Sequence, residues 1–311
     1  MIEHSFGGDW TREKLERVRK YLAAYVQILK NRPYSYAYID AFAGTGYINS
    51  KNGENLTDEE FQIALPELLE SEVKEFVDGS ARVALQIEPR FKKYIFIEKS
   101  KAKVTQLEAI KHDFPEQSKD IEVIHADANQ TLLEICGRSW AKSRAVLFLD
   151  PYGMQIPWRT IEKIASTEAI DLWYLFPIGV AINRLLKRDG NISNSVRNRL
   201  DQAFGETTWF ETFYRISQTS DIFGKNNILL EKTADFETIK EYFITRLESI
   251  FPGVAKNPLW LTNSKNTPLY LLCFACGNRH AAKVATKIAQ EILDPPKQKP
   301  KTVTDNQLSF F

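Results

Sequence analysis

Two glycines close behind an acidic residue are the first group in this chain whose types and spacing could do chemistry. Residues 38–46 are apolar up to Asp40 and then carry Gly44 and Gly46. Glycine has no Cβ, so the backbone can approach a ligand closely and adopt positive φ angles. A carboxylate at the end of a strand lies where open α/β sheets bind ligands. The spacing therefore predicts a site for a nucleotide-like cofactor.

Three further carboxylates are expected at the same edge of a sheet. Apolar runs rich in β-branched and aromatic residues end at or just before Glu98, Asp127 and Asp150, which is typical of strands buried on both faces of a parallel sheet. Helical patterns such as 101–111 separate the runs, which predicts a β-α-β-α-β order with right-handed crossovers. One such carboxylate alone is commonly a helix cap, but four in this order indicate a ligand site.

A dinucleotide-dependent dehydrogenase is the main competing interpretation. Its fingerprint requires a third glycine where this chain has Asn49. In addition, Asp150 is followed by Pro151, Tyr152 and Gly153, a combination with no role in hydride transfer. This run resembles the Asp/Asn-Pro-Pro-Tyr element of class I S-adenosylmethionine (SAM)-dependent methyltransferases that modify exocyclic amines of nucleic-acid bases, but it lacks the second proline.

If the protein methylates an amine, the residues of the run 150–153 have specific roles in the reaction. An exocyclic amine shares its lone pair with the ring until hydrogen bonds from its protons redirect it, and positioning supplies much of the rate. Asp150 and the carbonyl of Pro151 would accept those bonds, and Tyr152 would stack on the acceptor ring. A base within a duplex would first have to be flipped out.

The resemblance implies SAM as the cofactor and distributes its contacts over three strand ends. The methionine part would lie against Asp40, Phe42, Gly44 and Gly46, the ribose hydroxyls against Glu98, and the adenine against Asp127 and Ala128.

More closely, residues 11 to about 290 resemble the family of three-Cys-motif partner proteins. The matching stretches are 38–46, 94–99, 127–129, 148–155, 171–177 and 183–186. This resemblance implies a methyltransferase-like protein whose partner carries a three-cysteine motif like that of radical SAM enzymes. Two alternatives stay open: a non-catalytic or cofactor-binding partner subunit of that protein, and a methyltransferase of small molecules or proteins.

The cysteines of this chain are not that motif. Cys136 is isolated, and Cys273 and Cys276 lie three apart on a predicted strand, so they should face opposite sides. The four histidines offer no metal-ligand spacing. We therefore expect no metal site.

Length and composition are those of a cytoplasmic globular protein. The 311 residues can bury a large core, and an odd number of cysteines, three, gives no disulfide framework. No apolar run is long enough to span a bilayer, and the first residues lack the features of a signal peptide. A net charge of +1 does not by itself indicate a nucleic-acid binder.

Local charge is more informative. Between Lys51 and Asp78 there are nine acidic and two basic residues. We interpret residues 47–79 as an insertion, partly helical over 58–77, which is either a lid over the cofactor site or a solvated excursion. A basic cluster follows the fifth strand, with Arg184, Lys187 and Arg188 as candidate contacts for a phosphate-bearing substrate. The alternative is a solvated helix face.

These elements predict one α/β domain over residues 1–294. We expect a doubly wound, Rossmann-like, mostly parallel seven-stranded sheet of the class I methyltransferase type, with an antiparallel last strand and helical additions. An amphipathic helix over 11–30 should pack on the core or on a partner. A helical excursion is expected at about 181–230, and a helix over 231–251. Residues 258–262 and 269–276 should form a hairpin, with a helix over 279–293 after it.

A Pro- and Lys-rich flexible tail is expected at 295–311. Its end resembles the peptide by which bacterial replication and repair proteins dock on the DNA sliding clamp, with a phenylalanine in place of leucine. The residues of this match are Gln307, Leu308, Phe310 and Phe311. The alternative is a strap that folds back on the domain.

Overall fold

The computed structural model describes residues 10–45, 47–48, 77–220 and 226–294, with the backbone alone at 47–48, 77–78, 217–220 and 226–229. Several predictions from sequence fall outside these residues. They concern Gly46, all but the last residue of the helix over 58–77, the tail 295–311 and its clamp-like residues Gln307, Leu308, Phe310 and Phe311.

A single eight-stranded sheet runs through the molecule in the order β10-β12-β7-β6-β1-β4-β5, with β11 paired to β12. The five strands from β7 to β5 are parallel, and β12 is antiparallel to β7. This confirms the doubly wound, Rossmann-like sheet with an antiparallel last strand, and the predicted hairpin is β11–β12. The sheet has eight strands rather than the predicted seven, because the two-residue strand β10 also pairs with β12. The strands are β1 (Ser35–Asp40), β4 (Lys93–Glu98), β5 (Ile121–His125), β6 (Ser143–Leu149), β7 (Ile170–Phe176), β10 (Gly253–Val254), β11 (Leu259–Thr262) and β12 (Pro268–Cys276).

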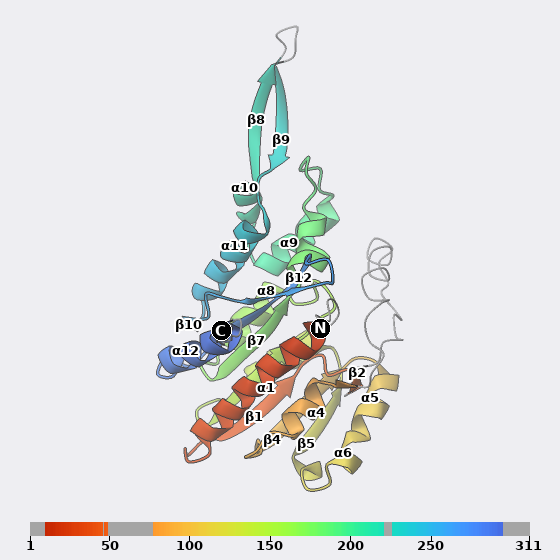
Figure 1. Cartoon of the computed structure of the whole chain (residues 1–311), viewed down its shortest axis with the longest axis vertical. Helices are drawn as coiled ribbons and strands as arrows, with labels where there is room; N and C mark the ends of the chain where they lie inside the picture. The colour runs from red at the N-terminus through yellow and green to blue at the C-terminus, as the bar shows by residue number, and fades with distance from the viewer. Residues whose placement is uncertain (1–9, 46, 49–76, 221–225, 295–311) are drawn as a thin grey trace, which may run out of the picture.

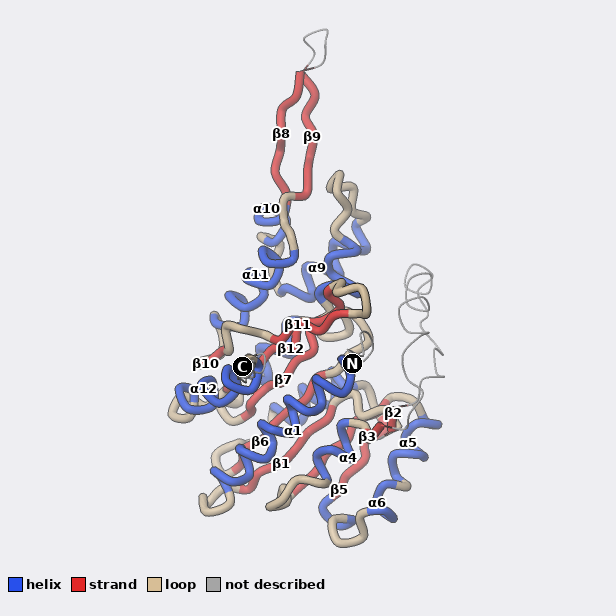
Figure 2. Tube along the Cα trace, viewed as in Figure 1, coloured by secondary structure: helices blue, strands red, loops and turns tan. Residues whose placement is uncertain are grey.

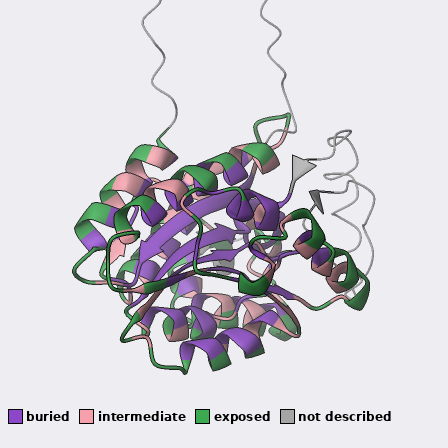
Figure 3. Cartoon of the chain, turned by 90° about the horizontal axis from the view of Figure 1, so that it is seen from below, coloured by how far each residue is buried: buried purple, intermediate pink, exposed green. Residues whose placement is uncertain are grey.

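Helices cover both faces of the sheet, whose central strands are almost entirely buried (Figure 3). One face packs against α1 (Trp10–Leu29), α4 (Ser80–Leu85), α5 (Lys101–Glu108), α6 (Ile110–Asp113) and α12 (Ala282–Leu293). We call it the α1 face. The opposite face packs against α7 (Ala128–Cys136), α8 (Trp158–Ala165), α9 (Asn194–Phe204), α10 (Trp209–Phe213) and α11 (Phe236–Glu248).

The two cores confirm that the thiols of β12 point in opposite directions. Cys273 belongs to the core under α11, whereas Cys276 belongs to the core under α1. Both thiols are free and buried. They therefore fill space in the two cores, as expected for small apolar side chains.

The helix predicted over 11–30 is α1, and it packs on the core as expected. It buries Leu15, Val18, Leu22 and Val26. Arg17 donates to the carbonyls of Ile292 and Asp294, at 2.5 and 3.1 Å, and so satisfies carbonyl groups at the end of α12. No helix within the described residues is both long and apolar enough to cross a membrane.

The excursion after β7 is only partly helical. It contains a π-helical turn, Ile178–Asn183, and helices α9 and α10, but then forms an antiparallel hairpin of β8 (Tyr214–Ser220) and β9 (Asn226–Lys232) that projects from the body (Figures 1 and 2). The prediction of a helix from residue 231 is wrong at its start. Asp235 caps α11 by accepting from the Thr238 amide at 2.8 Å, so the helix begins at Phe236.

Two smaller differences concern the first half of the chain. The helix predicted over 101–111 is divided at Ala109 into α5 and α6. The insertion is closed at its base by an antiparallel pair, β2 (Tyr47–Ile48) with β3 (Val77–Asp78).

A buried carboxyl ties α1 to β7 and gives a test of the packing. The Tyr21 hydroxyl donates to Asp171 Oδ2 at 2.7 Å, and desolvation raises the pKa of Asp171. Tyr21→Phe should lower the free energy of unfolding by about 1–3 kcal/mol, because a buried polar group loses its partner. Tyr25→Phe is the matched control, since no hydrogen bond of the Tyr25 hydroxyl is found among the described residues. Equal effects of the two variants in denaturant titrations would contradict this role.

Candidate active site

The register of the parallel strands brings three carboxylates together on the α1 face. Asp40 lies opposite Phe96 of β4 and Phe148 of β6. Both phenylalanines belong to the core under α1. Side chains alternate along a strand, so Asp40 points to the same face, and Glu98 and Asp150, two residues beyond each phenylalanine, follow the same alternation. The predicted carboxylate edge is therefore formed in the order Asp150, Asp40, Glu98.

Asp40 is fully buried and holds the turn that follows β1. Its Oδ1 accepts from the Phe42 amide at 3.2 Å, and its Oδ2 accepts from the Tyr38 hydroxyl at 3.4 Å. Desolvation raises its pKa to about 7, against the opposing effects of hydrogen bonds from Ser80, Phe42 and Tyr38, and Asp150 adds to the rise. This carboxyl therefore holds the backbone turn that leads into the glycine loop.

Glu98 fastens the glycine loop to the end of β4. Its Oε2 accepts from the Gly44 amide at 3.1 Å and its Oε1 from the Ser100 amide at 2.7 Å. Gly44 has a φ of 62°, and a Cβ added there would meet open space. The loop thus presents bare backbone beside a partly exposed carboxylate, as a site for a closely approaching ligand requires.

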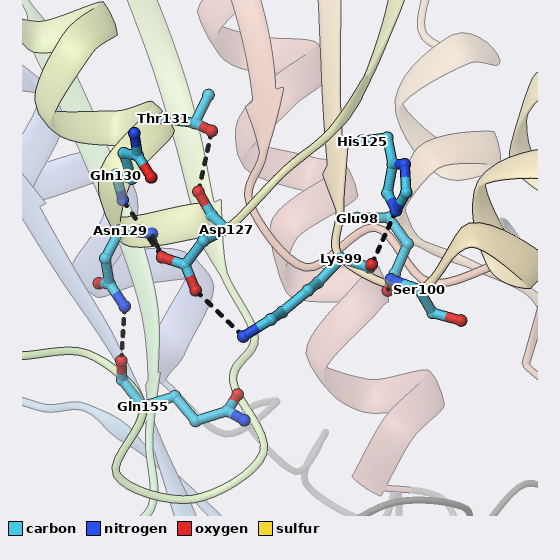
Figure 4. A network of polar contacts seen from close by, with 9 residues as sticks. All are labelled: Glu98, Lys99, Ser100, His125, Asp127, Asn129, Gln130, Thr131 and Gln155. Carbon is cyan, nitrogen blue, oxygen red and sulfur yellow. Dashed lines mark hydrogen bonds and ion pairs between the residues drawn. The ribbon is translucent and has the colours of Figure 1, made fainter.

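Asp127 caps the helix that follows β5 (Figure 4). Its Oδ1 accepts from the amides of Asn129 and Gln130 at 3.0 and 3.3 Å, and its Oδ2 lies 3.6 Å from the Lys99 ammonium. Ala128, the first residue of α7, is buried. The local role of Asp127 is therefore that of an N-cap, and its contact with a cofactor stays a prediction.

The loop after Asp150 is tied to the start of α7. Asn129 Nδ2 donates to the Gln155 carbonyl at 2.8 Å, a contact drawn in Figure 4, and Gln155 Oε1 accepts from the Tyr152 amide at 3.2 Å. Gly153 supplies the positive φ of 73° that this turn needs. The side chain of Tyr152 is 55% exposed, and the Lys103 ammonium lies 5.6 Å from its ring centroid. Pro151 is buried.

Sequence reasoning missed the partner of Asp150. The ammonium of Lys14, on α1, forms an ion pair with Asp150 Oδ2, and the two side chains are 7% and 24% exposed. The signal was present, because Lys14 lies four and seven residues before Val18 and Tyr21, on the buried stripe of the helix. A charge on such a stripe requires a partner, which sequence alone does not identify.

The predicted basic residues lie at the base of the β8–β9 hairpin. The Lys187 carbonyl accepts from the Tyr214 hydroxyl at 2.9 Å, and the Arg188 carbonyl accepts from the Lys232 amide at 2.9 Å. Lys232 Nζ donates to Asn183 Oδ1 at 2.5 Å. The pKa of Lys232 is lowered, mainly by partial burial and to a smaller extent by the positive charge of Arg188. Arg184, Lys187 and Arg188 are all exposed.

Other features of the surface lie apart from this edge. A pocket between β5 and α7, lined by Ile95, Ile124, Gln130, Glu134 and Arg138 among others, opens on the opposite face and contains none of the strand-end carboxylates. Within the described residues, no three His, Cys, Asp or Glu side chains are grouped to hold a metal ion.

No protein-family model matches the sequence, and no curated protein matches it either. Among solved structures, a protein from Legionella pneumophila has a TM-score of 0.39 at 15% identity, over 77% of this chain and 94% of that chain. A proposed methylase from Haemophilus influenzae has a TM-score of 0.31 at 13% identity, over 71% and 99%. Magnesium protoporphyrin IX methyltransferase from Synechocystis, solved with bound SAM, has a TM-score of 0.30 at 11% identity, over 72% and 81%. The strand order, rather than these likenesses, carries the assignment of the fold.

The raised pKa of Asp40 predicts a pH-dependent stability. The native carboxyl keeps its proton up to about pH 7, whereas the unfolded chain releases it near pH 4, so the native state binds more protons between these values. This group should therefore lower the free energy of unfolding as pH rises through that window, by at most about 1.4 kcal/mol per pH unit. Asp40→Asn should remove that component. Denaturant titrations from pH 4 to 8 give the free energy of unfolding of the wild type and of Asp40→Asn. The same dependence on pH in both proteins would contradict the prediction.

Proposed function

We propose that this protein is a SAM-dependent methyltransferase that acts on an exocyclic amine of a nucleic-acid base or nucleotide. The observation that supports it most strongly is the convergence of Asp150, Asp40 and Glu98 on one face, beside a glycine loop with an open approach at Gly44. Bound SAM supplies a reactive methyl group on a positively charged sulfonium.

The residues at this edge fit such a cofactor. Glu98 is partly exposed and suits ribose hydroxyls, because each of its oxygens accepts from one backbone amide and has a second lone pair for another donor. The glycine loop held by Asp40 offers backbone amides to the methionine part, around Phe42 and Gly44. Asp127 and the first turn of α7, including Ala128, would meet the adenine. The negative charge of Glu98 and Asp127 complements a cationic ligand.

The acceptor would lie between Asp150 and Tyr152. Asp150 Oδ1 has no hydrogen-bond partner among the described residues, so it can accept from an amine. The Pro151 carbonyl would accept the second amine proton. Tyr152 exposes 55% of its surface and offers a ring on which a planar acceptor can stack.

The basic residues at the hairpin base support a phosphate-bearing acceptor. Arg188 and Lys232 lie close enough for one charge to affect the other, and no ion pair of Lys187 or Arg188 is found within the described chain. Clustered cations favour a polyanion such as a nucleic-acid backbone. Small-molecule or protein acceptors, a three-Cys-motif partner and docking on the sliding clamp stay predictions from the sequence.

Cofactor binding should depend on Glu98. Isothermal titration calorimetry with SAM should give measurable affinity, and Glu98→Ala should weaken it about tenfold or more, because a charge-assisted contact is worth about 1.5–3 kcal/mol. Glu122→Ala is the control, since Glu122 lies on the next strand and pairs with Lys93 at 2.5 Å. An unchanged affinity in Glu98→Ala, or a preference for a nicotinamide cofactor, would overturn the assignment.

Methyl transfer should depend on Asp150. Wild-type protein incubated with radiolabelled SAM should label RNA or DNA from cells that lack the protein, and mass analysis should find a methylated exocyclic amine. Asp150→Ala should keep the cofactor affinity and lose the transfer, because Asp150 contacts the acceptor. Labelling of proteins or metabolites alone would reassign the substrate class. Absence of labelling in every pool would favour the partner-subunit alternative.

A further inference from the structure

Lys14 is a buried cation held between one aromatic ring and one carboxylate. Its ammonium pairs with Asp150 and lies 5.0 Å from the centroid of the Trp10 ring. Trp10 in turn stacks on Tyr270 of β12, with centroids 5.1 Å apart. The first turns of α1 therefore form part of the acceptor side of the site.

The ion pair is not required to anchor α1. Arg17 fastens the helix to the end of α12, Tyr21 fastens it to Asp171, and a stripe of apolar side chains packs on the sheet. Desolvating two charges costs several kcal/mol per ion, and an apolar pair of similar size is often at least as stabilising. The lysine at this position is therefore explained by its effect on Asp150 and not by the anchoring of the helix.

The pair sets the orientation of Asp150. An ionised carboxylate only accepts hydrogen bonds. Lys14 binds Oδ2, so the side chain is held in one orientation. The other oxygen stays available at a position that is still 24% exposed.

We propose that Lys14 is a positioning residue that holds Asp150 as an oriented, acceptor-only carboxylate and thereby selects acceptors that present an amine rather than a carbonyl. This inference rests on the proposed function. A ring amine donates two hydrogen bonds to such a site, whereas a ring carbonyl would meet a carboxylate oxygen and be repelled. The preferred acceptors are then amine-bearing bases such as adenine and cytosine.

The test compares Lys14→Met and Lys14→Arg with a control on the same helix. Lys20→Met removes a lysine whose pair with Glu16, at 2.8 Å, is exposed. With the nucleic acid that the wild type methylates, Lys14→Met should lower kcat/KM about tenfold at neutral pH, because Asp150 loses the group that orients it. Lys14→Arg should restore most of the rate, and Lys20→Met should match the wild type. SAM affinity should be the same in all four proteins.

A double-mutant cycle separates positioning from support of the fold. Asp150→Asn keeps one acceptor oxygen, so it should retain some transfer. If Lys14 acts through Asp150, adding Lys14→Met to Asp150→Asn should change the rate less than about twofold. An equal loss in both backgrounds, or a Lys14→Arg variant no more active than Lys14→Met, would overturn the proposal.

Thermal denaturation shows whether each variant is folded. Should Lys14→Met fail to fold, the comparison of Asp150→Asn with the double variant decides, because neither leaves a carboxylate buried without its lysine. A further loss in the double variant overturns the proposal, and equal rates support it. Absence of transfer by the wild type would overturn the proposed function together with this inference, whereas wild-type transfer with an undiminished rate in Lys14→Met overturns the inference alone.

Discussion

The parallel pairing of β6, β1 and β4 fixes where the polar groups of the candidate site can lie. Backbone hydrogen bonds set Asp40 opposite Phe96 and Phe148. Once that register is fixed, the alternation of side chains sends Asp40, Glu98 and Asp150 to the α1 face. A slip of one residue in one strand would send its carboxylate into the opposite core.

The carboxylates of Asp40, Glu98 and Asp150 lie close together and repel one another. Each of them is stabilised in a different way. Asp40 is withdrawn from water, and its raised pKa of about 7 limits the charge that is buried. Glu98 accepts from two backbone amides. Asp150 has the ammonium of Lys14. A cationic cofactor would add to this compensation, because it brings positive charge to the same edge.

Helix α1 carries Lys14, the partner of Asp150, and also packs against the rest of the fold. Its apolar side chains bury one face of the sheet, while Arg17 and Tyr21 make polar contacts with α12 and β7. These contacts hold α1, and therefore Lys14, in place. This matters because a carboxylate can be oriented only by a group that is itself fixed. The same helix therefore stabilises the sheet and completes the candidate site.

The sequence alone determined the sheet and the four strand-end carboxylates, because these depend on local periodicity and on the rule that parallel strands end at one edge. It also determined that Cys273 and Cys276 face opposite cores, since a strand alternates its side chains. The β8–β9 hairpin was missed, because the helical excursion was expected to extend to about residue 230, across both of its strands. Only the tertiary structure decided the partners of the charged groups. Lys14 and Asp150 are separated by 136 positions in the chain, and no local pattern specifies which buried cation meets which carboxylate. That choice is made by the packing of α1 across the sheet.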